Sequence, residues 1–157
     1  MHRVTRRVAP ALAGIAILAA VCLVVPLAAT ASAPEAVTFE IGGVLTGPTS
    51  FGGPWEATGA INDGGTYVGS ARFAGDTVHV VNVFTGAKGT ITVEAEAVVV
   101  ATSETTLAFK AGSWRVVSGT GAYASLNGGG VPATDPGTLD LATGVLDVTR
   151  HGFVQLD

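Results

Sequence analysis

Apolar and polar residues alternate along short stretches of this 157-residue chain, and glycine-rich turns separate the stretches. Residues 37–41 alternate Val, Phe and Ile with Thr and Glu, as expected for a strand with one buried face. Residues 91–97 set Ile, Val and Ala against Thr and Glu in the same way. The pattern predicts no amphipathic helix of useful length, so it indicates an all-β protein.

The turn signals between these stretches divide the chain into individual strands. Asn-Asp-Gly-Gly at 62–65 and Gly-Ala-Lys-Gly at 86–89 are typical of tight β-turns. Residues 46–54, with two prolines, are predicted to form a loop, and residues 119–130 an irregular segment with one helical turn. Gly112 is predicted to be the turn of a hairpin. The predicted strands are residues 37–41, 55–61, 66–74, 77–84, 90–102, 106–111, 113–118, 137–141 and 145–156.

Eight or nine short strands in meander order predict an antiparallel up-and-down β-barrel of about eight strands, with a β-sandwich as the alternative. Two segments, 78–84 and 98–100, are apolar on both faces. In a closed barrel one of these faces points outward, which favours a homo-oligomer, either a trimer or a dimer. The other possibility is that the 46–54 loop covers the outer face.

The N-terminal residues have the order of a cleavable secretory signal peptide. Three arginines precede an apolar run over residues 11–29, and small residues follow the run. An uncleaved membrane anchor is the alternative, but Pro26 near the end of the run argues against it. Cleavage after Ala31 is predicted. The chain then divides into a signal peptide, 1–31, and one secreted β-barrel domain, 32–157.

Removal of the signal peptide changes the composition of the chain. Five basic and twelve acidic residues remain, so residues 32–157 carry a net charge of −7. An acidic domain with so few Lys and Arg side chains is a poor partner for nucleic acid or for an anionic membrane. The only cysteine, Cys22, leaves with the signal peptide, so the exported domain is expected to have no disulfide.

Three segments together resemble the barrel shared by plant dirigent proteins, allene oxide cyclases and secreted bacterial proteins with the same domain. They are residues 82–93, residues 114–123 and the closing strand, 143–154, and in order and spacing they cover roughly 66–156. The resemblance implies an eight-stranded antiparallel barrel, often a trimer. It also implies an activity, because characterised members steer cyclisation or radical coupling of hydrophobic small molecules without a cofactor.

The most specific part of this resemblance is a Gly-Thr-Gly-x-aromatic element formed by Gly119, Thr120, Gly121 and Tyr123. Glycines allow a positive φ and a sharp exit from a strand. Tyr123 is therefore predicted to fold back and close one end of the barrel, which is an architectural role.

Arg150 is the most informative charged residue. Alternate apolar residues of its strand share its face, so an inward-facing strand would place Arg150 inside the barrel. A buried arginine needs a carboxylate, which Glu94 or Glu96 could supply, and the pair would orient an anionic ligand. The alternatives are an Arg150 that reaches solvent at the barrel mouth, and glutamates on the solvated face. Trp55 and Tyr67 are predicted to line a ligand pocket or to pack in the core.

The sequence has no motif for a catalytic nucleophile, a phosphate-binding loop or a metal site, and no cofactor is predicted. His79 and His151 are isolated in the sequence. Three roles remain open. The favoured role is non-catalytic binding of a small hydrophobic ligand or a protein partner. The alternatives are a cofactor-free cyclase or isomerase and a purely structural exported protein.

Overall fold

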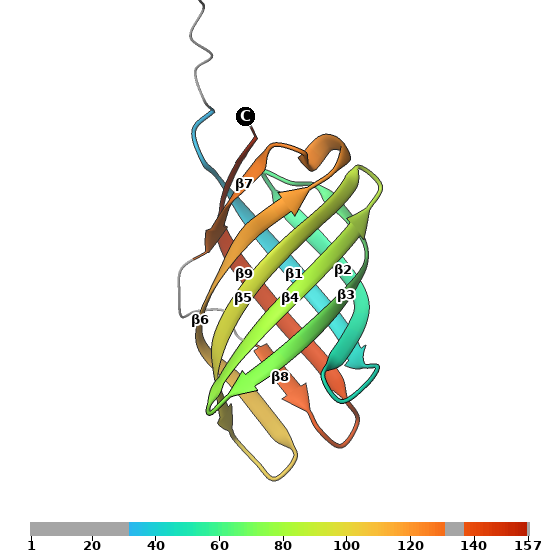
Figure 1. Ribbon diagram of the computed structural model, residues 1–157, viewed down its shortest axis with the longest axis vertical. Helices are drawn as coiled ribbons and strands as arrows, with labels where there is room; N and C mark the ends of the chain where they lie inside the picture. The colour runs from blue at the N-terminus through green and yellow to red at the C-terminus, as the bar shows by residue number, and fades with distance from the viewer. Residues whose placement is uncertain (1–31, 131–136, 157) are drawn as a thin grey trace, which may run out of the picture.

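The computed structural model describes residues 32–130 and 137–156. The predicted signal peptide, residues 1–31, lies outside the described residues together with Cys22 and the predicted cleavage after Ala31. In the described part, the chain forms nine strands and one short 3-10 helix (Figure 1). They are β1 (Glu35–Leu45), β2 (Ser50–Gly59), β3 (Asp63–Ala74), β4 (Thr77–Gly86), β5 (Gly89–Ala101), β6 (Thr106–Gly119), η1 (Gly121–Tyr123), β7 (Leu126–Gly130), β8 (Gly137–Asp140) and β9 (Val145–Leu156).

The strands form a closed antiparallel eight-stranded barrel with one additional strand. Each strand from β1 to β6 pairs with the next one along the chain, and β9 pairs with β1 to close the ring. β7 and β8 both bridge β6 and β9, at different levels: β7 pairs beside Trp114 of β6, and β8 pairs with residues 106–109. The predicted barrel is confirmed, and the sandwich alternative is wrong.

Three local predictions are wrong, and in each case pairing with a neighbouring strand overrides the local signal. Residues 50–54 belong to β2 instead of a loop, and they pair with β3. Gly112 lies inside the continuous strand β6, opposite Ala97 of β5, instead of at a turn. Residues 126–130 form β7, whose three consecutive glycines give no alternation to detect. Such pairing depends on the tertiary context rather than on intrinsic propensity.

Alternate residues of the long strands face the interior and form one core. Phe39 of β1 lies at its centre, with ring centroids 6.0 Å from Trp55, 5.6 Å from Phe84 and 5.4 Å from Trp114. Tyr67 of β3 extends the cluster, 5.5 Å from Phe84. Tilted and edge-to-face ring contacts of this kind stabilise a core beyond the apolar area that they bury.

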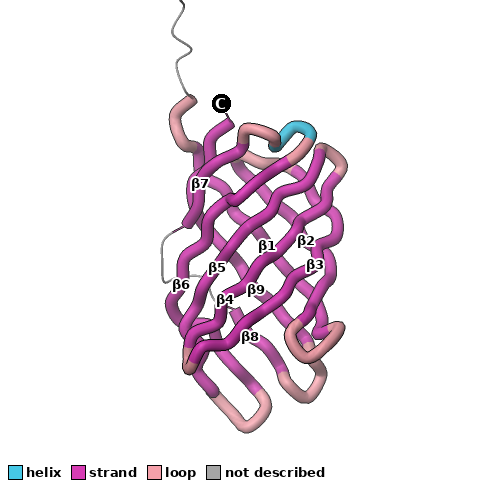
Figure 2. The backbone as a smooth tube through the Cα atoms, in the orientation of Figure 1, coloured by secondary structure: helices cyan, strands magenta, loops and turns pink. Residues whose placement is uncertain are grey.

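The two ends of the barrel differ. Helix η1 and the β4–β5 turn lie at the upper end in Figure 1, whereas the β5–β6 and β8–β9 turns lie at the lower end. Figure 2 shows η1, the only helical segment of the described residues, at the rim of the upper end. No helix within the described ranges is long and apolar enough to cross a membrane.

Candidate ligand-binding site

The lower end of the barrel contains a cavity of about 210 Å³ that opens to solvent. Residues from every strand except β7 line the cavity, and most of them are apolar. Four aromatic side chains contribute to its wall, Phe51, Phe73, Phe109 and Trp114. Phe73 and Leu141 are each about half exposed and mark the mouth.

The cavity exists because the inward-facing side chains become smaller toward the lower end. On β5, Ile91 and Val93 are fully buried, and the next inward residues, Ala95 and Ala97, line the cavity. Ala71 of β3 is a similarly small lining residue. The interior of an eight-stranded barrel is just wide enough for side chains to fill, so short side chains leave space for a ligand.

Two polar side chains, from β4 and β9, lie at the inner end of the cavity. Asn82 is only 1 % exposed. With its amide oxygen turned toward Arg150, Asn82 Oδ1 accepts hydrogen bonds from Nη1 at 3.0 Å and from Nη2 at 3.2 Å. Leu146, Val148 and Arg150 are alternate residues of β9 that line the cavity, so Arg150 lies about 13 Å along the strand from Leu146. The cavity is therefore apolar over most of its length and polar at its inner end.

Gly69 of β3 provides the space for this polar pair. It lies directly opposite Asn82 in the β3–β4 ladder. A Cβ atom at position 69 would collide with the Phe51 ring and with the Asn82 amide. The absence of a side chain at Gly69 thus allows Phe51 and Asn82 to face the interior together.

Tyr67 is buried in the core next to the residues of the cavity wall. Its ring lies 6.0 Å from that of Phe51, and its hydroxyl lies against the backbone of Gly43. Among the described residues, the Tyr67 hydroxyl has no hydrogen-bond partner. Burial raises the pKa of Tyr67 to about 12, and the charge of Arg150 opposes this rise. The phenol is therefore protonated at neutral pH and can donate a hydrogen bond.

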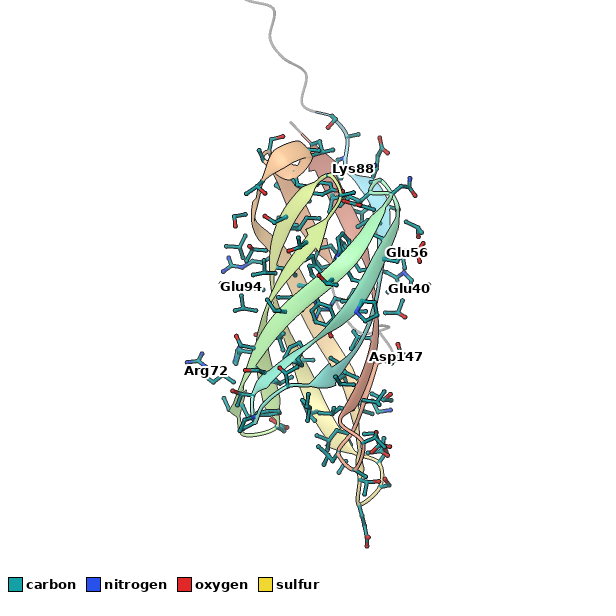
Figure 3. All side chains as sticks on the ribbon, turned by 90° about the vertical axis from the view of Figure 1, so that its right-hand side faces the viewer. Glu40, Glu56, Arg72, Lys88, Glu94 and Asp147 are labelled. Atoms are coloured by element: carbon teal, nitrogen blue, oxygen red, sulfur yellow. The ribbon has the colours of Figure 1, made fainter. Side chains whose placement is uncertain are left out.

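Glu94 and Glu96 lie on the solvated face of β5, which is one of their two predicted placements. The other, in which they supply a carboxylate to Arg150, is wrong. Arg115 donates to Glu94 Oε2 through Nε at 3.1 Å and through Nη2 at 2.5 Å. Glu96 Oε2 lies 3.7 Å from His79 Nδ1, and both side chains are substantially exposed. Figure 3 shows Glu94 projecting away from the barrel. Alternation with the buried residues of β5 imposes this orientation.

Trp55 packs in the core and does not line the cavity. It is 3 % exposed, and its indole Nε1 donates to the Thr85 carbonyl oxygen at 3.2 Å. Of the two roles predicted for Trp55 and Tyr67, the structure therefore shows core packing. His151, the other isolated histidine, has its Nδ1 3.0 Å from the exposed Thr38 hydroxyl.

The Gly-Thr-Gly-x-Tyr element closes the upper end of the barrel, as predicted. Gly121 has a φ of 61°, which turns the chain out of β6 and into η1. Tyr123 then points back into the barrel and is 3 % exposed. Thr120 ties the turn to β5, since its hydroxyl oxygen accepts from the Thr90 amide at 3.1 Å.

Asp63 stabilises this closed end through hydrogen bonds. Its carboxylate accepts hydrogen bonds from the Tyr123 hydroxyl at 2.8 Å, from the Gly64 amide at 2.9 Å, and from the Ala87 and Lys88 amides at 3.1 Å. Burial acts to raise the pKa of Asp63, but the four hydrogen bonds outweigh it and hold the pKa below its usual value. Burial and the neighbouring carboxylate raise the pKa of Tyr123. One side chain thus joins the β2–β3 turn, the β4–β5 turn and η1.

Asn82 is the polar residue at the inner end of the cavity that the sequence analysis did not select. The signal was present, because Asn82 is the one polar residue among the inward positions of an otherwise apolar strand, between Val80 and Phe84. A polar residue at an inward position needs a hydrogen-bond partner inside the barrel. Applied to the sequence, that requirement would have predicted a hydrogen bond between Asn82 and Arg150.

In the described ranges, no group of three or more His, Cys, Asp or Glu side chains is arranged to hold a metal ion. Comparisons with protein-family models, curated proteins and solved structures found no match.

Proposed function

We propose that this protein binds a small apolar molecule inside the open end of its β-barrel. The cavity of about 210 Å³, with its largely apolar wall and its mouth between Phe73 and Leu141, carries the proposal. An apolar cavity of about 150 Å³ is enough to bind benzene. A ligand with one ring and a small substituent therefore has the right size.

The side chains around the cavity favour ligand binding without catalysis. Its titratable lining residues, among those described, are Glu96, Lys110 and Arg150, and the first two are exposed. A cofactor-free cyclase or isomerase, the class that the resemblance implies, needs an acid or a base within reach of the buried ligand. A purely structural barrel would have its interior filled by its own side chains. The cavity supports binding better than either alternative.

The place of action and the assembly of the protein belong to the same proposal. The N-terminal pattern supports export, so the ligand would be met outside the cell. Val68 is 67 % exposed on the outer face of β3, and Val81 is 42 % exposed on the neighbouring β4. These outward apolar residues support self-association of the barrel.

Titration of the ¹⁵N-labelled protein with toluene, followed by NMR, tests the binding function. We expect saturable shifts at amides around the cavity, and at least a tenfold loss of affinity in Ala71→Phe, which fills the cavity. Ala74→Phe is the matched control, because Ala74 lies in the same strand and is exposed. Absence of saturable shifts in the wild-type protein, or an undiminished affinity in Ala71→Phe, would refute the proposal.

A further inference from the structure

The polar groups of the cavity point to a narrower class of ligand. We infer that the ligand is a compact aromatic carboxylic acid, which enters with its carboxylate first and is held by Arg150. This inference rests on the proposed binding function and adds to it the head group, the tail and the orientation of the ligand.

The orientation follows from the uneven distribution of polarity along the cavity. Most side chains around its outer and middle parts are apolar, including Phe73 and Leu141 at the mouth, and the charged lining residues Glu96 and Lys110 are exposed. Asn82 and Arg150 lie at its inner end. A ligand with one polar end satisfies both regions only when that end points inward, because a buried polar group without a hydrogen bond is costly.

The head group follows from the donors at that inner end. A guanidinium is permanently charged and carries five N–H donors in a planar fork, so Arg150 can serve Asn82 and a ligand together. Tyr67 packs in the core and does not line the cavity, so Arg150 supplies the charged donors at this end. Donors and a positive charge select an anionic acceptor, and a carboxylate matches the guanidinium fork.

The tail follows from the wall and the volume of the cavity. Phe51, Phe73, Phe109 and Trp114 provide ring faces and edges against which an aromatic ligand can pack. The volume of about 210 Å³ exceeds by a small margin the roughly 150 Å³ that holds a benzene ring. Phenylacetate, with one ring, one methylene and one carboxylate, is the simplest molecule of this class.

The net charge of −7 for residues 32–157 opposes the approach of an anion. Salt screens such long-range repulsion beyond roughly 8 Å at physiological ionic strength. The guanidinium acts at contact distance, where one opposite charge outweighs many distant ones. The overall acidity therefore slows the approach of the ligand more than it weakens the bound state.

The experiment compares three ligands of equal shape with different head groups, phenylacetate, 2-phenylethanol and 2-phenylethylamine, by NMR titration of the wild-type protein at pH 7. We expect phenylacetate to bind at least tenfold more tightly than the neutral alcohol, and the cationic amine to bind most weakly. Equal affinities for acid and alcohol, or a preference for the amine, would overturn the inference. If toluene binds in that case, the proposed binding function still stands; if toluene does not bind, the function itself fails.

Substitution of Arg150 shows whether the preference comes from its charge. Arg150→Gln is expected to lower the affinity for phenylacetate at least tenfold and to change the affinity for 2-phenylethanol by less than twofold. Arg115→Gln is the matched control, since this outer arginine is 72 % exposed, and it should keep the wild-type preference. A preference retained in Arg150→Gln would contradict the inference.

Arg150→Lys is a second variant, which tests the inference if Arg150→Gln fails to fold. It keeps the positive charge but replaces the planar fork of donors by a single ammonium group. We expect the preference for phenylacetate over 2-phenylethanol to persist and to fall about threefold. An unchanged preference, or no preference at all, would contradict a carboxylate held by the guanidinium fork.

Discussion

The two ends of this barrel are built from the same strands but are completed in opposite ways. At the upper end, Tyr123 folds into the interior and its hydroxyl is fixed by Asp63. At the lower end, small inward residues such as Ala95 and Ala97 leave a cavity with Arg150 at its inner end. The comparison shows that the size of the inward side chains along each strand decides where an eight-stranded barrel is solid and where it is hollow.

The largest expected difference between the two ends is in their contribution to stability. Tyr123→Ala should lower the free energy of unfolding by about 3–5 kcal/mol, because it removes a buried aromatic ring and its hydrogen bond. Phe73→Ala at the open mouth should cost less than about 1 kcal/mol, since Phe73 is already half exposed. Urea denaturation of both variants measures the difference. Equal costs would mean that the two ends do not differ as described.

A smaller effect is expected from a methyl group added beside the polar pair of the open end. Gly69→Ala should destabilise the protein by about 1–3 kcal/mol, because the new Cβ collides with Phe51 and Asn82. It should also weaken toluene binding by displacing the cavity wall. Gly42→Ala is the control, since a Cβ there meets only Pro54, at 3.9 Å. If both variants match the wild type in denaturation and titration, Gly69 does not have the proposed role.

The smallest expected effect concerns the pH dependence of the closed end. The folded pKa of Asp63 is lower than its usual 3.8, so its contribution to stability is complete above about pH 5 and is lost as the pH falls through 4 and below. Asp63→Asn should cost about 1 kcal/mol at pH 7 and flatten the fall in stability between pH 5 and pH 3.

Asp147→Asn controls for the loss of one negative charge, because Asp147 projects from the outer surface in Figure 3. Urea denaturation at pH 3, 5 and 7 compares the two variants with the wild-type protein. The same steep fall in stability in Asp63→Asn and in the wild type would show that Asp63 does not control the acid sensitivity of the closed end.

Much of this architecture could be predicted from the sequence, because alternation identifies the inward-facing residues of a strand without any tertiary information. β1, β3, β4, β5 and β9 follow from that pattern, and the glycines around Thr120 predict the turn that buries Tyr123. The inward position of Arg150 follows in the same way from the apolar residues of its strand.

The remaining features depend on register, that is, on which residues of neighbouring strands lie opposite each other. The sequence of one strand does not determine this. Glu94 has the right charge for Arg150, but it pairs with Arg115 on the other side of the wall. Asn82, a neutral residue, takes the inner position. Of the two placements predicted for Glu94 and Glu96, the structure shows the solvated face, which the alternation along β5 also indicates. The extra strand β7 was missed for a related reason. Its glycines show no alternation, so only its pairing with neighbouring strands makes this segment a strand.

A crystal structure under xenon pressure would show directly whether the barrel is solid at one end and hollow at the other. Xenon enters apolar cavities that are large enough to hold it. We expect one xenon site between Phe51, Val80 and Ala95 at the open end, and none around Tyr123 at the closed end. An open end without xenon, filled by side chains of the protein itself, would contradict this difference between the two ends.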